Sequence, residues 1–66
     1  MGSSFTPALI RLLRRAGCHF VRDGKGDHQI WYSPISHKNF TVDSKILSRH
    51  TANGTLVQAG LPKQFF

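Results

Sequence analysis

A β-hairpin is predicted by residues 18–32, CHFVRDGKGDHQIWY. Residues 18–22 form a β-prone run that stops at residues 23–27, where two glycines and two aspartates favour a turn. Residues 28–32 form a second β-prone run. A connection this short joins antiparallel strands, so the two runs are expected to pair. Apolar residues occur at both parities of the second run, so the pattern leaves open which of its faces is buried.

A third strand and a helix are expected after the hairpin. Residues 39–42 place Phe40 and Val42 on one face, and the short connection to the preceding strand favours an antiparallel meander. Residues 43–49 are expected to form an irregular crossover. Residues 51–59 have the spacing of a helix with one apolar face.

The best-defined element precedes the hairpin, where residues 7–16 carry leucines at helical spacing. Thr6 is expected to be the N-cap and Pro7 the first helical residue. Gly17 is expected to end this helix as a left-handed cap, and Gly60 to end the second helix in the same way. The opposite side of the first helix, which should point away from the sheet, carries Arg11, Arg14 and Arg15.

This order of helix, three strands and helix predicts an α+β fold of two layers, with the helices on one face of the sheet. The chain has 66 residues, of which 39% are hydrophobic, so residues 1–66 are expected to form a single domain with one small core. No apolar run approaches the about 20 residues of a membrane span, and the opening MGSS lacks the order of a secretory signal. A single cysteine, Cys18, fits a reducing compartment, which favours the cytoplasm.

The charge of the chain is strongly basic. Nine Lys and Arg residues stand against three Asp, which gives a net charge of +6 at pH 7. Such a charge on so small a surface favours polyanions, with nucleic acid ahead of membrane. An acidic protein partner is the alternative, and the two partners are compatible.

Metal and cysteine chemistry are disfavoured by the spacing of the candidate side chains. No pair of histidines has the short spacing of a structural zinc site, and Cys18 is expected to be buried filler. The chain has no Glu, so no acidic cluster is available for two-metal nuclease chemistry. We therefore expect no metal site and no small-molecule cofactor. Any phosphodiester cleavage would need a side chain that moves protons near neutral pH, and histidine is suited to that.

His28 is the histidine in the most suggestive setting. It follows a glycine-rich turn and opens a strand, with Arg22 and Lys25 close enough in sequence to hold a phosphate beside it. From the residues alone, an ordinary solvated histidine at a strand end is the favoured interpretation. His50 precedes the second helix, where it can contact a phosphate together with Arg49 or simply serve in a turn.

Four segments together resemble the HicA family of toxins, the mRNA interferases of bacterial HicA–HicB toxin–antitoxin pairs. They are residues 12–17 (LLRRAG), 26–31 (GDHQIW), 48–53 (SRHTAN) and 58–62 (QAGLP). They occur in the family's order and extend over nearly the whole chain, from about residue 7 to residue 62.

The resemblance implies a fold like the double-stranded-RNA-binding domain and a catalytic histidine that opens the second strand, which here is His28. It also implies an antitoxin of the HicB type as partner. The sequence departs from the family pattern at Asp27, where Ser or Thr is common, and at Gly54, where a better helix former is expected. The Asp27 departure places a carboxylate next to the imidazole in the sequence.

The leading interpretation is a metal-independent endoribonuclease that acts on mRNA, in which His28 moves the proton while the RNA's own 2′-hydroxyl attacks the adjacent phosphate. His50 or water is the expected second acid–base group. The residues expected to hold the RNA backbone are Arg22, Lys25, Lys45 and Arg49. A non-catalytic RNA-binding module of the same fold, or a basic domain that binds an acidic protein, are the alternatives; steep salt dependence of binding would indicate phosphate contacts.

Overall fold

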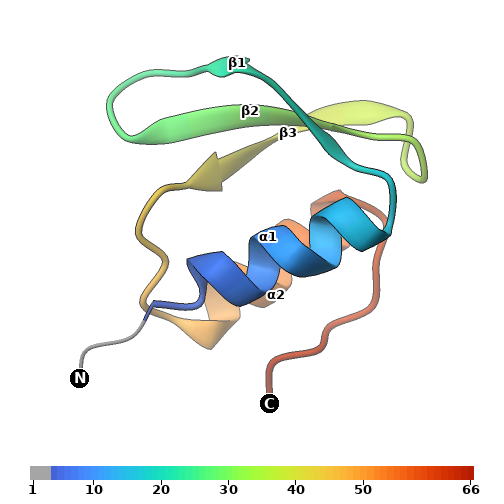
Figure 1. The fold of residues 1–66 in the computed structure, drawn as a ribbon. Coiled ribbons are helices and arrows are strands. Elements are labelled where there is room, and N and C mark those ends of the chain that lie inside the picture. Colours follow the sequence, from blue (N-terminus) through green and yellow to red (C-terminus); the bar gives the residue numbers. More distant parts are fainter. Residues whose placement is uncertain (1–3) are drawn as a thin grey trace.

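Two helices cover one face of a three-stranded antiparallel sheet (Figure 1). The structure, a computed structural model, describes residues 4–66. Its elements are α1 (Thr6–Arg15), β1 (His19–Asp23), β2 (His28–Ser33), β3 (Lys38–Asp43) and α2 (Arg49–Gln58). The predicted two-layer α+β fold is confirmed. The expectation about a secretory signal falls mainly on residues 1–3, outside the described part. None of the helices within that part is long and apolar enough to span a bilayer.

The strands lie in the order β1-β2-β3, with Trp31 of β2 at the centre of the sheet. Trp31 is opposite Phe20 on β1 and Phe40 on β3. Trp31, Phe40 and Val42 are buried under the helices. Because side chains alternate along a strand, His28 belongs to the opposite face, here called the outer face. The burial of Trp31 thus settles which face of β2 lies in the core.

The core lies between the sheet and the predicted apolar faces of the helices. Leu9 and Leu13 of α1, and Ala52 and Leu56 of α2, are fully buried. Cys18 is also buried in this core, at 4% exposure, as expected of a small apolar filler. Helical spacing in the sequence therefore identified the residues that join the two layers.

The arginines of α1 do not all point away from the sheet. The guanidinium carbon of Arg14 lies 5.4 Å from the centroid of the Trp31 ring. A long side chain can bend over the edge of its helix and keep its stem on apolar surface, and a guanidinium is attracted to an indole face. The expectation that the arginine side of α1 faces only solvent is wrong for Arg14.

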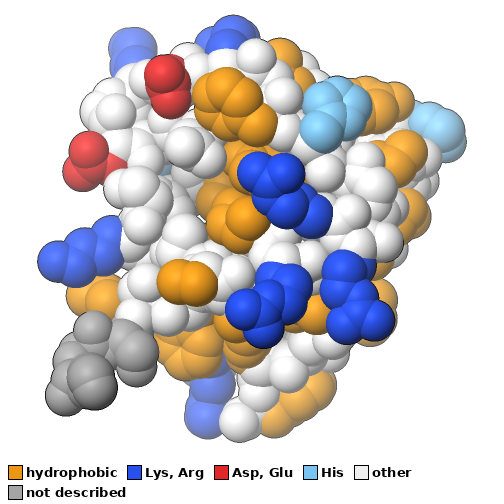
Figure 2. Space-filling view, viewed as in Figure 1, with side chains coloured by type: hydrophobic (Ala, Val, Ile, Leu, Met, Phe, Trp, Pro, Cys, Tyr) orange, Lys and Arg blue, Asp and Glu red, His pale blue; other side chains and the backbone are white. Residues whose placement is uncertain are grey.

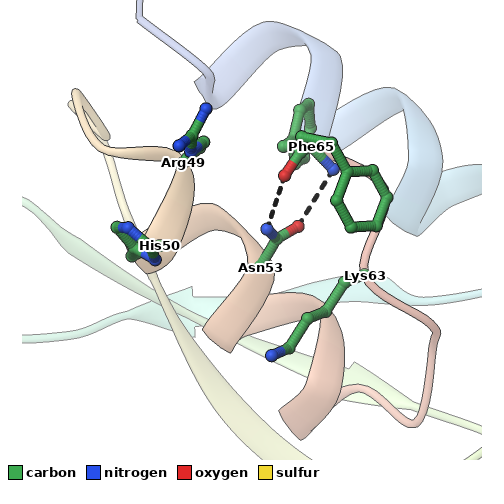
Figure 3. A pocket seen from close by; sticks show the side chains of 6 residues that line it. Arg49, His50, Asn53, Lys63 and Phe65 are labelled. Atoms are coloured by element: carbon green, nitrogen blue, oxygen red, sulfur yellow. Dashed lines mark hydrogen bonds between the residues drawn. The ribbon is translucent and has the colours of Figure 1, made fainter.

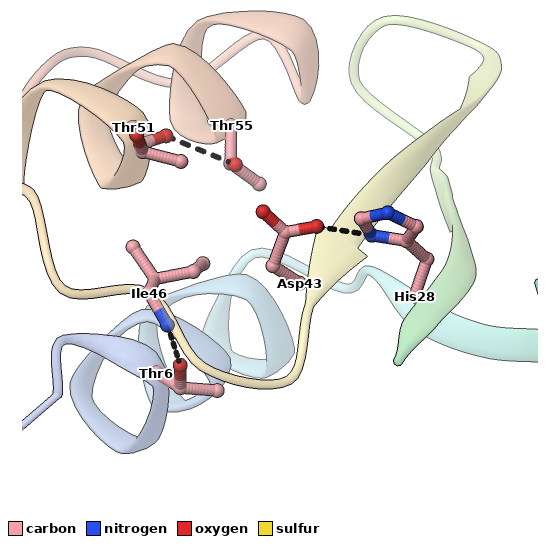
Figure 4. Close-up of polar contacts among 6 residues, drawn as sticks. All are labelled: Thr6, His28, Asp43, Ile46, Thr51 and Thr55. Atoms are coloured by element: carbon pink, nitrogen blue, oxygen red, sulfur yellow. Dashed lines mark hydrogen bonds and ion pairs between the residues drawn. The ribbon is translucent and has the colours of Figure 1, made fainter. Parts of the chain in front are cut away.

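The start of α1 differs from the expected Thr6 cap. Phe5 occupies the N-cap position, and Thr6 is already helical. The Thr6 hydroxyl instead accepts a hydrogen bond from the Ile46 amide at 2.9 Å (Figure 4), and the Phe5 amide donates to the Ile46 carbonyl at 2.7 Å. A contact between residues 40 apart in the chain therefore replaces the local cap.

Both helices end at a glycine, as predicted. Gly17 and Gly60 have φ angles of +94° and +83°. The amide after each glycine reaches back to a carbonyl five residues earlier, at 2.9 and 2.8 Å, which is the Schellman arrangement. Both glycines also pack against the β2–β3 turn: a Cβ at Gly17 would lie 3.2 Å from Pro34, and one at Gly60 only 2.8 Å from Ile35.

The β2–β3 turn is fastened to α2 by a buried serine. The Ser33 hydroxyl donates to the Ala59 carbonyl at 2.6 Å and accepts from the Ile35 amide at 3.1 Å. Ser33 is fully buried, so these bonds satisfy a polar group that would otherwise be costly in the core.

The two helices run in the same direction across the sheet (Figure 1). α2 begins at Arg49, earlier than expected, because the Ser48 hydroxyl accepts from the His50 amide and caps the helix there. The starts of both helices lie at the same end of the molecule as the β1–β2 loop and the end of β3. Both helices finish at the other end, beside the β2–β3 turn.

Candidate functional site

His28 and Asp43 form a cross-strand pair at one end of the sheet. His28 is the first residue of β2, Asp43 is the last residue of β3, and the strand register sets them opposite each other. The imidazole Nδ1 and Oδ1 of Asp43 are in direct contact, as an ion pair when His28 is protonated (Figure 4). The carboxylate that contacts the imidazole therefore comes from the neighbouring strand rather than from Asp27.

This pairing defines what the imidazole can do. A neutral histidine that donates from Nδ1 carries its lone pair on Nε2. The His28 side chain is 50% exposed and that of Asp43 is 39% exposed, so a solute can reach the pair from solvent. A proton taken up at Nε2 would make an imidazolium that the adjacent carboxylate stabilises, which is the usual arrangement of a general base.

Backbone hydrogen bonds hold the loop before His28 in place. The His28 amide donates to the Lys25 carbonyl at 3.1 Å, and its carbonyl accepts from the Gly24 amide at 2.8 Å. The Asp27 carbonyl accepts from Ser44, just beyond β3, at 3.0 Å. The loop is thus tied to both strands that carry the pair, which limits how far His28 can move relative to Asp43.

A β-bulge in β1 places Arg22 on the outer face. Phe20 is opposite Trp31, but the register then shifts so that Arg22, rather than Val21, is opposite Ile30. Ile30 and His28 are two residues apart on β2, and Arg22 is therefore the diagonal neighbour of His28. Diagonal Cβ atoms lie about 7–8 Å apart, within reach of an arginine. If the unchanged sequence paired regularly, with Val21 opposite Ile30, Arg22 would be opposite Gln29 and would belong to the inner face.

The charge around His28 is mixed. Lys25 lies exposed in the β1–β2 loop, and Lys45 lies exposed in the segment between β3 and α2. All three aspartates of the chain are also in the hairpin or at the end of β3. Figure 2 shows Lys and Arg side chains gathered over α1, whereas the Asp side chains in view lie toward the loop end of the sheet. The surplus positive charge is therefore greater on α1 than beside His28.

Arg49 and His50 belong to a different place. They line a hollow of about 310 Å³ between α2 and the last residues of the described chain (Figure 3). His28 is not among the residues that line it. The structure does not bring His50 into the His28–Asp43 pair, so the expectation that His50 supplies the second acid–base group gains no support from its position.

The described residues hold no cluster of three or more His, Cys, Asp or Glu side chains of the kind that binds a metal ion. The one short contact between such groups is the two-residue pair of His28 and Asp43.

Residues 7–61 match the sequence model of a protein family described as “HicA toxin of bacterial toxin-antitoxin”. The chain belongs to the HicA toxin family. The resemblance in the four sequence segments is thereby confirmed. A HicA protein is the toxin of a bacterial toxin–antitoxin system and has a cognate antitoxin as partner. No curated protein and no solved structure matches the chain.

The segments that resemble the HicA family have different roles in the structure. Within residues 48–53, Ser48 caps α2, and the Asn53 side chain holds the C-terminal segment through Gln64 and Phe65. The other segments contain the two helix-ending glycines and the strand with His28. His28 therefore lies in one of the four HicA segments, and His50, the expected second acid–base group, lies in another.

Two features of this HicA protein were missed by sequence reasoning. Asp43 follows the predicted strand 39–42 by one residue, and the register that pairs it with His28 is not visible in hydrophobic alternation. Lys63 and Phe66 lie beyond the predicted elements, and only the tertiary fold brings them beside Arg49. A carboxylate at the end of a neighbouring strand is the one signal that would have indicated Asp43.

Proposed function

We propose that this HicA toxin is an endoribonuclease that cleaves mRNA in the cytoplasm without a metal ion, with His28 as its general acid–base. The observation that supports this most directly is the exposed His28–Asp43 pair. The His28 side chain is half exposed, which leaves Nε2 accessible, and the Asp43 carboxylate lies against Nδ1 on the other side of the ring. An RNA-binding module needs no such pair.

The proposed reaction uses the nucleophile that RNA already contains. Nε2 of His28 takes the proton from a 2′-hydroxyl, and the 2′-oxygen attacks the adjacent phosphorus. The bond from phosphorus to the 5′-oxygen breaks, and that oxygen receives a proton from water. The products are a 2′,3′-cyclic phosphate and a 5′-hydroxyl end. DNA lacks the 2′-hydroxyl and is expected to be spared.

Nearby cations are proposed to stabilise the negative charge that builds up on the phosphate oxygens. Arg22 shares the outer face with His28, and Lys25 lies in the loop that leads into it. Lys45 follows β3 in the chain, two residues after Asp43. Preorganised positive groups aimed at developing charge commonly contribute more to catalysis than the proton transfer itself.

The cognate antitoxin is proposed to be a HicB-type protein that covers the outer face of the sheet around His28. The basic charge of the toxin favours an acidic partner surface, which would also speed association. Covering His28 would block access of RNA to Nε2 and so keep the toxin inactive.

The experiment compares His28→Asn with His37→Asn, because the two variants make the same substitution at two exposed histidines. His37 has a φ of 59°, a conformation that Asn tolerates, and lies in the β2–β3 turn far from the pair. With labelled RNA in EDTA, we expect His28→Asn to lose at least about a hundredfold in cleavage rate and His37→Asn to stay near wild type.

Circular dichroism tests whether both variants are folded. The ends of the cleavage products are analysed for the 2′,3′-cyclic phosphate. Wild-type cleavage by a folded His28→Asn protein would refute the catalytic role. Binding of RNA without cleavage by the wild type itself would leave the RNA-binding module as the function.

A further inference from the structure

The hollow beside α2 is built from two segments that are distant in the sequence. Arg49, His50 and Asn53 come from the first turns of α2, and the facing wall comes from the C-terminal segment (Figure 3). Its volume is about 310 Å³. The residues of the facing wall are Lys63, Phe65 and Phe66.

Hydrogen bonds and ring packing hold this hollow open in a defined shape. The Asn53 amide nitrogen donates to the Phe65 carbonyl at 2.7 Å. Its oxygen accepts from the amides of Gln64 and Phe65, at 3.1 and 3.0 Å. The Phe65 ring packs edge-on against Phe5, with 5.3 Å between ring centroids. The C-terminal segment is therefore fixed against α2, and the residues around it keep their places.

The groups at the rim combine positive charge with an aromatic surface. Arg49 and Lys63 carry permanent charge and are exposed, and His50 lies beside Arg49. No Asp or Glu side chain lines the hollow, in contrast to the mixed charge around His28. The Phe66 ring is 89% exposed, the highest value among the large hydrophobic side chains described. Phe66 therefore offers an accessible flat apolar ring in the same hollow as the cations Arg49 and Lys63.

A nucleotide of a single RNA strand has the chemistry that matches this rim. Its phosphate is an anion for Arg49 and Lys63, and its base is a flat ring that can stack on Phe66. Proteins that bind single strands combine backbone-tracking cations with aromatic platforms in this way. A peptide of acidic residues alone, such as poly-glutamate, would pair with the cations but would leave the aromatic ring uncovered.

We propose that this hollow is a binding site for one nucleotide of the RNA strand, outside the site of cleavage; the assignment of RNA as the ligand rests on the function proposed above. The base stacks on Phe66, and the phosphate binds Arg49 and Lys63. The chain from Asp43 to Arg49 covers six residue steps, so their Cα atoms are at most about 20 Å apart. A strand of a few nucleotides spans that distance, and the exposed Lys45 lies in the chain segment that joins Asp43 to Arg49.

The test measures binding rather than cleavage. A fluorescent single-stranded 2′-O-methyl oligoribonucleotide, which lacks the nucleophile, is titrated with the toxin at several salt concentrations. Lys63→Ala should weaken binding several-fold and reduce the salt slope by about one. Phe66→Leu removes the flat ring but keeps apolar bulk, and it should weaken binding at least about fivefold without changing the slope.

Lys38→Ala is the matched control, because Lys38 is exposed but lies beside the β2–β3 turn, at the other end of the molecule. It should weaken binding less than Lys63→Ala does. Wild-type affinity in both Lys63→Ala and Phe66→Leu would overturn the proposal. The proposal would also be overturned by a second pair of results. In it, a poly-glutamate peptide displaces the oligonucleotide, and Phe66→Leu binds the oligonucleotide with wild-type affinity.

The same titration on His28→Asn separates this proposal from the catalytic one. Retained binding in His28→Asn is expected, since Nε2 of His28 is not part of the hollow. If His28→Asn still cleaves RNA, the catalytic role fails while the nucleotide site stands. If His28 proves catalytic but the hollow variants bind normally, only the nucleotide site fails.

Discussion

Asp43 is expected to act on the reaction through the imidazole. Asp43→Asn keeps the shape of the side chain but removes the charge that stabilises a protonated His28. We expect kcat for RNA cleavage to fall by about ten- to a hundredfold, or about 1.4–2.7 kcal/mol, with KM little changed. If Asp43 served only in folding, Asp43→Asn would lower the amount of folded protein. The kcat per folded molecule would then equal that of the wild type.

Asp27→Asn is the control for Asp43→Asn, because it removes the same charge at the same end of the sheet. The backbone carbonyl of Asp27 accepts a hydrogen bond from the Ser44 amide, and this bond does not depend on the Asp27 side chain. Equal losses in the two variants would mean that His28 responds to general charge, and the positioning role of Asp43 would be wrong.

Two glycines in and after α2 should respond in opposite directions to alanine. At Gly60, a φ of +83° and an Ile35 methyl 2.8 Å from the new Cβ should cost about 2 kcal/mol of folding free energy. At Gly54 the helix is regular and nothing lies within 4 Å of the new Cβ. Gly54→Ala should therefore stabilise by about 0.5–1 kcal/mol.

Thermal unfolding of the two variants and the wild type, at one protein concentration, measures both effects. A lower midpoint for Gly54→Ala would show that this departure from the HicA pattern has a structural reason that the folded state does not reveal. An unchanged midpoint for Gly60→Ala would mean that the β2–β3 turn can move away.

At the level of the elements, the helices and strands were largely predictable because each obeys a local rule. The leucines of α1 repeat at helical spacing, and glycine is the residue that a left-handed cap requires. The start of α1 was not predictable in detail, since Thr6 bonds to Ile46 in another part of the chain. The same limit applied to the site: His28 was visible, but its partner Asp43 depended on strand register.

The bulge in β1 leads to a prediction about deletions. The pairs Phe20–Trp31 and Arg22–Ile30 flank Val21, which has no partner of its own in the register. Val21 is 43% exposed, so removing it costs little apolar burial. Deleting Val21 should therefore keep the hairpin register and the place of Arg22 on the outer face, and the protein should remain folded.

Deleting Gln29 provides the contrast, because it shifts His28 relative to both neighbouring strands and turns its side chain to the other face. Circular dichroism and RNA cleavage of both deletions are the measurements. We expect a folded, active protein without Val21 and an unfolded or inactive one without Gln29. Loss of fold on deletion of Val21 would show that the bulge itself is required.

At the scale of the whole molecule, the cations should divide into two groups. Arg15 is exposed on α1, in the region of surplus charge, and should attract RNA only at long range. Lys25 lies in the loop at His28 and is expected to contact the reacting phosphate. Arg15 is a cleaner probe than Arg14, whose guanidinium also packs on Trp31.

Arg15→Ala should lower kcat/KM slightly at low salt and not at all at high salt, where charges beyond about 3–10 Å are screened. Lys25→Ala should cost on the order of a hundredfold at either salt concentration. Rates for both variants at 0.05 M and 0.5 M salt are compared with the wild type. A larger loss in Arg15→Ala at high salt would place the reacting phosphate on α1 instead.

The shared direction of α1 and α2 has an electrical consequence. In a helical hairpin the chain doubles back, and the peptide dipoles of the two helices largely cancel. Here both helices begin at the end with the β1–β2 loop, because the whole sheet lies between them in the chain. Each helix start carries about half a positive elementary charge, so the two add. The backbone itself thus offsets part of the negative charge of the three aspartates at the end where RNA is proposed to bind.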